Sequence, residues 1–168
     1  MQQTSIEGRP SARPADVLLA GGTLADAAGM GSRELEAIYS LAYQEMEQQH
    51  FVDAEKTLRG LCLVSHNSPR YWLALGACRQ KMGAYELAIH AYSMVADLGD
   101  PDPTAPLRAA ECYLMLGLYE EALSGIKAAM AQVRHAEDPL ALVQHLELLF
   151  HALEKASGNE TPREQASR

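Results

Sequence analysis

The sequence lacks the long apolar runs and the basic charge that mark two large classes of protein. Its longest apolar runs, such as residues 17–20, are far too short to span a membrane. Its 14 basic and 22 acidic residues give a net charge of −8 at pH 7. Nucleic acids and anionic membranes need a basic face. The sequence therefore predicts a soluble protein that binds neither of them directly.

Cysteine is scarce as well. The three cysteines, Cys62, Cys78 and Cys112, include no C-x-x-C pair and cannot all pair with one another. We expect them to be buried, reduced thiols. The polar N-terminus has no apolar segment of the kind found in signal peptides, so the chain is expected to act in the cytoplasm.

No pattern of catalytic residues stands out. The sequence contains no H-E-x-x-H, P-loop or G-x-S-x-G motif, and its six histidines are scattered. Cys78 and Cys112 are 34 residues apart, which is the spacing of a repeat in this chain, and this indicates a role in packing rather than as a nucleophile or a metal ligand. The sequence therefore predicts no catalytic residue, no metal site, no cofactor and no enzyme activity.

The chain divides into a central helical region and two polar tails. β-Branched residues are few, and apolar residues recur at helical spacing from residue 14 to residue 156. Residues 1–13 and 157–168 are polar, and they are expected to form a disordered N-terminal tail and a flexible C-terminal tail. Residues 21–22, 29–32 and 99–103 are breaks rich in glycine or proline, and Ser32 is expected to cap the helix that follows it.

The central region carries a repeat of 34 residues. Small residues recur at this spacing in two sets, and aromatic residues recur in a third. The sets are Ala42, Gly76 and Ala110; Ala54, Ala88 and Ala122; and Phe51, Tyr85 and Tyr119. The second unit closely resembles the tetratricopeptide pattern W-x2-L-G followed by G-x-Y-x2-A, through Trp72, Leu75, Gly76, Gly83, Tyr85 and Ala88.

These observations predict an all-α protein of three tandem tetratricopeptide-type hairpins in a short superhelix. The units span about residues 35–68, 69–102 and 103–136, and residues 14–31 cap or pair at one end. A last helix over about 139–156 carries an apolar stripe that covers the other end, formed by Leu142, Leu146, Leu149 and Leu153. In each hairpin the small residues allow the two helices to approach closely, and the aromatic residue plugs the turn.

The first helix of each hairpin is expected to line an inner, concave face. By helical spacing, the inner positions are the second, fifth, ninth and twelfth residues of a unit. The candidates for a peptide-binding groove are Tyr39, Tyr43, Met46, Leu73, Ala77, Leu107, Glu111 and Leu114. Such an apolar wall is typical of a binding site for an extended hydrophobic segment.

Alternative placements exist for the aromatic residues. Tyr39 and Tyr43 could pack under the N-terminal cap instead of facing a groove. The repeat fold also needs large residues in its core, and four aromatic residues are better explained there: Trp72, Tyr85, Tyr92 and Tyr119.

The stretch from Leu18 to about Val133 closely resembles the class II chaperones of bacterial type III secretion, the LcrH/SycD group. The most specific part is the block L-G-A-C-R-Q-x-M-G-x-Y-x-L-A-I-H over residues 75–90. Further matching stretches are residues 21–24, 35–42, 61–62, 73–74 and 109–112.

The resemblance implies a cytoplasmic bacterial chaperone that binds hydrophobic, pore-forming translocator proteins and keeps them soluble and ready for export. A segment of the translocator would lie in the concave groove, on which Tyr39, Tyr43 and Met46 fall. Family members often form homodimers, here through the region of Gly60, Val64 and Leu75, and some assist a transcriptional regulator. Two alternatives remain from the residues alone: a repeat scaffold that joins folded proteins, and a co-regulator that binds a DNA-binding protein.

Overall fold

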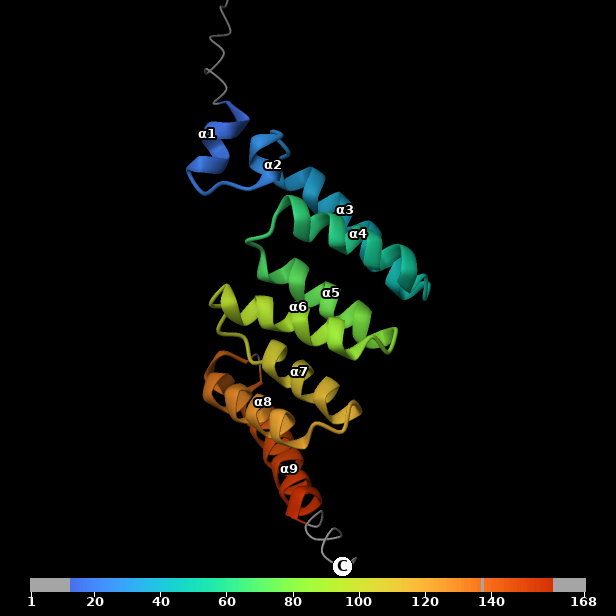
Figure 1. Ribbon diagram of the computed structural model, residues 1–168, viewed down its shortest axis with the longest axis vertical. Coiled ribbons are helices and arrows are strands. Elements are labelled where there is room, and N and C mark those ends of the chain that lie inside the picture. The colour runs from blue at the N-terminus through green and yellow to red at the C-terminus, as the bar shows by residue number, and fades with distance from the viewer. Residues whose placement is uncertain (1–12, 137, 159–168) are drawn as a thin grey trace, which may run out of the picture.

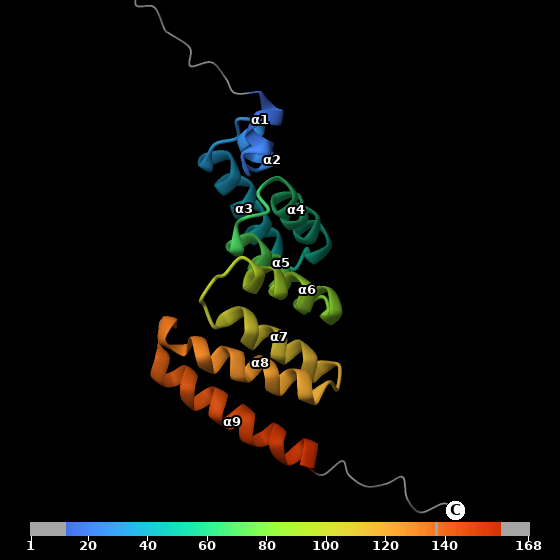
Figure 2. The ribbon, with the colours of Figure 1, turned by 60° about the vertical axis from the view of Figure 1, so that its left-hand side comes forward.

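The computed structural model describes residues 13–136 and 138–158, with side chains to residue 155. These residues form nine α-helices, one short 3-10 helix and no strand. The helices are stacked in chain order along the long axis of the molecule, with α1 and α9 at opposite ends (Figure 1; Figure 2). Their bounds are α1 Pro14–Leu19, α2 Leu24–Ala27, α3 Ser32–Glu47, α4 Phe51–Val64, α5 Pro69–Lys81, α6 Tyr85–Asp97, α7 Thr104–Met115, α8 Tyr119–Gln132, η1 Val133–His135 and α9 Pro139–Gly158.

The predicted all-α fold of three tandem hairpins is confirmed. The pairs α3/α4, α5/α6 and α7/α8 each form an antiparallel hairpin, and each hairpin packs mainly on the next one in the chain. This arrangement buries a continuous core from elements that could not bury their apolar faces alone.

Small residues at the repeat positions bring the paired helices together, as predicted. Ala42, Ala54, Ala88, Ala110 and Ala122 are completely buried. A Cβ atom added to Gly76 would lie 2.5 Å from the ring of Tyr92, which is closer than any real contact. The absence of a side chain at this position therefore lets α5 pack against α6.

The turns within the hairpins place one residue in the left-handed region of backbone conformation. Gly83 and Gly117 take this position in the second and third hairpins, with φ of 75° and 74°. Gln49 takes the equivalent position in the first hairpin, with φ of 61°. Glycine adopts this conformation without steric cost, whereas a residue with a Cβ does not.

The expected cap at Ser32 is wrong. The capping position is Gly31, in extended conformation, and Ser32 is already the first residue of α3, with no capping hydrogen bond from a side chain. A Cβ on residue 31 would lie 2.8 Å from Glu34 Oε2, so the carboxylate of Glu34 fills the space where a side chain at the capping position would stand.

The two ends of the stack are covered differently. At the N-terminal end, Thr23 and Asp26 form a capping box for the short helix α2, which contacts α4. At the C-terminal end, α9 packs along α8, with Leu146 and Leu153 buried and Leu142 and Leu149 half-buried on the same core. The predicted apolar stripe thus faces α8. No helix in the described ranges is long and apolar enough to span a membrane.

The three cysteines are buried and unpaired with one another. Burial raises the pKa of Cys62 to about 12 and the pKa of Cys78 and Cys112 to about 11. Because the thiolate is the reactive form, these thiols are inert at neutral pH. Across the described residues, His, Cys, Asp and Glu side chains form no group of three that could hold a metal ion.

Candidate peptide-binding groove

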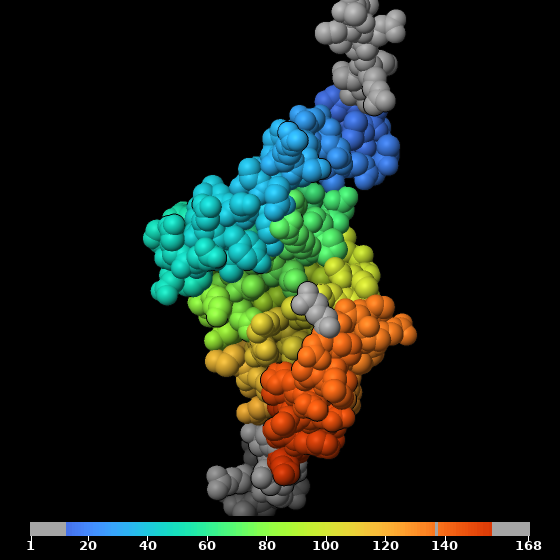
Figure 3. Space-filling model, turned by 180° about the vertical axis from the view of Figure 1, so that it is seen from behind, coloured from blue at the N-terminus to red at the C-terminus, as the bar shows by residue number. Residues whose placement is uncertain are grey.

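The first helices of the three hairpins, α3, α5 and α7, line one face of the molecule with three cavities of about 360, 540 and 330 Å³. Figure 3 shows the molecule from behind, with the N-terminal hairpin and α9 standing forward of its recessed middle. These volumes lie at the lower end of the range for sites that hold ligands, so each cavity suits one or two side chains.

The first cavity lies between α3 and α5 and is built around Tyr39. The Tyr39 ring, 6% exposed, lies 5.0 Å from the ring of Tyr43 and 5.4 Å from that of Tyr71. The guanidinium of Arg70 lies 3.9 Å from the centre of the same ring, a cation–π contact. Tyr43, 48% exposed, presents the free aromatic surface of this cavity. All the residues that line it come from α3 and α5, so the two tyrosines do not pack under the N-terminal cap.

An ion pair crosses this end of the face. Arg70 donates from both terminal nitrogens to the two carboxylate oxygens of Glu36, over 2.7 and 3.0 Å. The hydrogen bond from Arg70 lowers the pKa of Glu36, and the same contact raises the pKa of Arg70. Burial, followed by neighbouring Tyr43, raises the pKa of Tyr39 to about 12, so its hydroxyl stays protonated at neutral pH. This exposed ion pair links α3 to α5 beside the tyrosines.

The second cavity lies between α5 and α7 and contains a hydrogen-bonded network. The buried Tyr92 hydroxyl donates to Gln80 Oε1 over 2.8 Å, and Gln80 Nε2 donates to Glu111 Oε2 over 2.9 Å. Arg108 donates to the same carboxylate oxygen over 3.0 Å. Because both ends of the Gln80 amide are held, its orientation is fixed. Apolar side chains complete the walls of this cavity: Ala77, Tyr85, Leu114 and Met115.

The third cavity lies where the start of α7 meets α9. Leu107 and Thr104 of α7 line it together with Leu142 of α9. The last helix therefore contributes to this face as well as covering the core.

The structure brings the predicted groove residues together only in part. Tyr39 and Tyr43 share the first cavity, Ala77, Glu111 and Leu114 share the second, and Leu107 lines the third. Met46 and Leu73 line none of the three; they are half-buried and pack against the core. Charged and amide groups alternate with the apolar ones along this face.

Several lining residues were not predicted: Ser40, Gln44, Glu47, Lys81, Tyr85, Arg108 and Met115. Most lie three or four residues from a predicted one, so a wider stripe on each helix would have included them. The sequence predicts a core position for Tyr85. It is half-buried and packs on the core while it also lines the second cavity.

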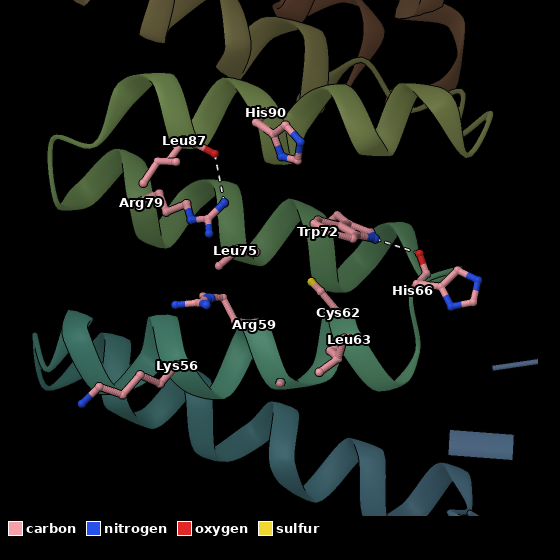
Figure 4. A pocket seen from close by; sticks show the side chains of 11 residues that line it. Lys56, Arg59, Cys62, Leu63, His66, Trp72, Leu75, Arg79, Leu87 and His90 are labelled. Atoms are coloured by element: carbon pink, nitrogen blue, oxygen red, sulfur yellow. Dashed lines mark hydrogen bonds between the residues drawn. The ribbon is translucent and has the colours of Figure 1, made fainter. Parts of the chain in front are cut away.

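The other side of α5 faces a larger cavity of about 990 Å³ between α4 and α6 (Figure 4). It includes two of the three residues expected at a dimer contact. Gly60 is exposed at this cavity, whereas Leu75 is 1% exposed and forms its floor. Val64 is half-buried and does not line it. The dimer contact stays a prediction.

No family model matches the chain. The low calcium response locus protein H of Yersinia pseudotuberculosis serotype I (strain IP32953) is 43% identical over 122 residues, which are 73% of this chain and 71% of that protein. Among solved structures, a type III secretion complex from Aeromonas hydrophila superposes with a TM-score of 0.81 at 32% identity, covering 87% of this chain and 97% of that one.

The Yersinia enterocolitica type III secretion chaperone SycD, solved in complex with a peptide of the translocator YopD, superposes with a TM-score of 0.71. The two chains are 36% identical, and the match covers 76% of this chain and 98% of SycD. The repeat fold and the cavities on its inner face are consistent with the family that these likenesses indicate. The chain belongs to the LcrH/SycD family of class II type III secretion chaperones.

Proposed function

We propose that this protein is a cytoplasmic chaperone that binds hydrophobic translocator proteins of a type III secretion system and keeps them soluble until export. The observation that carries the proposal is the match to SycD, which was crystallised with a translocator peptide, on a chain whose own inner face offers three cavities. As a chaperone the protein acts by binding and catalyses no reaction.

The inner face fits an extended segment with alternating side chains. Apolar side chains of the segment enter the cavities at Tyr43, Leu114 and Leu107, while its backbone amides meet polar groups between them. Glu36, Arg70, Gln80 and Glu111 are fixed by their own hydrogen bonds. A face that is already ordered pays less entropy when it binds, which favours capture of a flexible client.

Co-expression tests the function directly. The chain is expressed with the hydrophobic translocators of a type III secretion system, and the soluble fraction is captured through a tag on the chain. We expect a translocator to be soluble and captured only in the presence of the chain. If translocators stay insoluble and an already stable protein is captured instead, the function is that of a scaffold or a co-regulator.

Tyr43→Glu tests the position of the site. Tyr43 is half-exposed, so the substitution should leave the helical content unchanged while it puts a charge into the first cavity. We expect binding of a labelled translocator peptide to weaken at least tenfold, about 1.4 kcal/mol. Leu148→Glu, on the exposed side of α9, is the matched control and should bind normally. Equal binding by both variants would place the site elsewhere.

A further inference from the structure

The cavity between α4 and α6 forms an open apolar groove on the face opposite to the proposed client site. Its floor is made by Cys62 of α4 and by Trp72 and Leu75 of α5. Leu63 and Leu87 stand on its two sides and are 68% and 53% exposed. Large apolar side chains with this exposure, gathered around one cavity, are typical of an interaction surface.

A second groove in the same molecule shows what the repeat architecture alone produces. It lies one repeat further along, between α6 and α8, and its volume is about 280 Å³ against about 990 Å³ for the first. Seven positions line both grooves at a spacing of 34 residues. The pairs are Arg59 and Ser93, Cys62 and Ala96, Trp72 and Pro106, Leu75 and Ala109, Arg79 and Tyr113, Leu87 and Glu121, and His90 and Ser124. The size, apolar floor and positive charge of the first groove are therefore not consequences of the fold.

Gly60 keeps the first groove open. A Cβ atom added to Gly60 would meet nothing within 4 Å, although the residue lies in the middle of α4. The equivalent residue of the next hairpin is Met94. Glycine within a helix costs about 0.5–1 kcal/mol relative to alanine. The bare backbone at this position lets another chain approach α4 closely.

The lining of the groove is cationic within an acidic protein. Lys56, Arg59 and Arg79 line it with His66 and His90, and no Asp or Glu is among its lining residues. Two neighbouring carboxylates offset part of this charge: Asp53 lies 2.9 Å from Lys56, and Glu55 lies 3.0 Å from Arg79. The side chain of Arg59 is 64% exposed and lies 3.7 Å from Glu55, so it stays available to a partner.

We propose that this groove binds an amphipathic helix of a partner protein, with an apolar stripe flanked by Asp and Glu. A helix laid between α4 and α6 would place its stripe on Trp72 and Leu63 and its carboxylates beside Lys56 and Arg59, which is the helix-in-groove mode of recognition. The dimer contact expected at Gly60 and Leu75 would compete for the same groove, and a second copy would bring its own Lys56 and Arg59 to this cationic rim. Since the groove and the proposed client site use opposite sides of α5, both can be occupied together.

The only tryptophan of the chain is Trp72, which provides a direct readout. Its indole Nε1 donates to the carbonyl oxygen of His66 over 2.8 Å, and its ring lines the groove. The probe is an 18-residue peptide with leucine at i, i+3, i+4 and i+7 spacing, glutamate at the positions that flank this stripe and alanine elsewhere, so that it can form a helix. Its titration into the full chain should shift Trp72 emission to shorter wavelength and saturate. The same peptide with lysine in place of glutamate should bind at least tenfold more weakly.

Two pairs of variants locate the effect. The double variant Lys56→Glu/Arg59→Glu should bind the acidic peptide at least tenfold more weakly. The double variant Arg33→Glu/Lys155→Glu makes an equal change of net charge away from the groove and should bind the peptide normally. Gly60→Leu should block the peptide by filling the open space, and Gly60→Ala should retain binding. Both substitutions at Gly60 favour the helix, so circular dichroism should show an unchanged fold.

Three results would overturn the proposal. Equal affinity for the acidic and basic peptides would mean that the groove is an apolar surface without charge specificity. A shift of Trp72 emission with protein concentration alone, together with a dimer in sedimentation, would assign the groove to a second copy. Competition between the acidic peptide and a translocator peptide would make the groove part of the client site, and would leave the chaperone function itself intact.

Discussion

At the scale of single residues, the turn of the first hairpin carries a strained residue that the other two hairpins avoid. Gln49 has φ of 61°, at the position that Gly83 and Gly117 occupy in the following units. The left-handed conformation costs a residue with a Cβ about 1–2 kcal/mol. Glycine at this position would lose this strain and would add a smaller cost, because it makes the unfolded chain more flexible.

Gln49→Gly is therefore expected to stabilise the protein by about 0.5–1 kcal/mol. The measurement is urea unfolding followed by circular dichroism. Gln48→Gly is the matched control, since Gln48 has φ of −80° and gains nothing from glycine. That variant should be destabilised by a similar amount. The strain at Gln49 is absent if both variants lose stability equally.

The predictable residues are those whose role repeats. Ala42, Gly76 and Ala110 are small in every unit because every hairpin needs the same close approach, so the period alone identifies them. Met46 and Leu73 show the limit of this reasoning. Both lie at inner positions, yet each side chain packs against the core. The burial of a long, flexible side chain depends on its neighbours in space, which helical spacing does not reveal.

At the scale of helices, one buried arginine ties three of them together. Arg79 of α5 donates to Glu55 of α4 over 3.0 and 3.2 Å and to the carbonyl oxygen of Leu87 in α6 over 3.1 Å. Both charged side chains are less than one fifth exposed. A guanidinium in such a position depends on its partner, because an unpaired charge away from water is costly.

Glu55→Ala is expected to cost about 3 kcal/mol in the free energy of unfolding, since it leaves Arg79 without its carboxylate. The double variant Glu55→Ala/Arg79→Met removes both partners and should lose less unfolding free energy than Glu55→Ala alone. The control is Asp53→Ala, which breaks the exposed pair with Lys56 on the same helix and should cost about 1 kcal/mol or less. If Glu55→Ala and Asp53→Ala lowered the free energy of unfolding by the same amount, Arg79 would not depend on Glu55.

Contacts between helices set the limit of what could be predicted about the site. Inner positions at helical spacing do place Ala77, Glu111 and Leu114 around one cavity. The network through Gln80 could not be predicted, because its anchor is Tyr92, a residue of the second helix of the hairpin. Spacing along one helix carries no information about a side chain that reaches it from another.

At the scale of the whole molecule, three buried thiols are expected to make the free energy of unfolding depend on pH in the alkaline range. Their folded-state pKa values of about 11 to 12 lie above the value of about 8.5 for an unfolded cysteine. As pH rises above 8.5, the unfolded chain loses these protons while the folded chain keeps them. The free energy of unfolding should therefore fall, by at most about 1.4 kcal/mol per pH unit and thiol, until the pH reaches the folded-state values.

Cys112→Ala removes one of these thiols and tests the effect. The loss of stability between pH 8.5 and pH 9.5 should be smaller in this variant by about 1 kcal/mol than in the unchanged chain. The comparison uses the change with pH within each protein, so the cost of the substitution at neutral pH cancels. Identical losses would mean that the Cys112 thiol ionises equally in both states.

The last helix covers the open end of the repeat stack. Each hairpin offers the next one an apolar surface, and α8 would offer its own if α9 did not cover Ile126 and Ala129 with Leu146 and Leu153. A stack with such an open end can grow head to tail, which produces open filaments rather than closed assemblies. With Leu146 and Leu153 turned inward, the outer side of α9 presents polar residues such as Gln144 and Glu147 beside the exposed Leu140 and Leu148. The last helix thereby blocks the surface through which such a stack would continue.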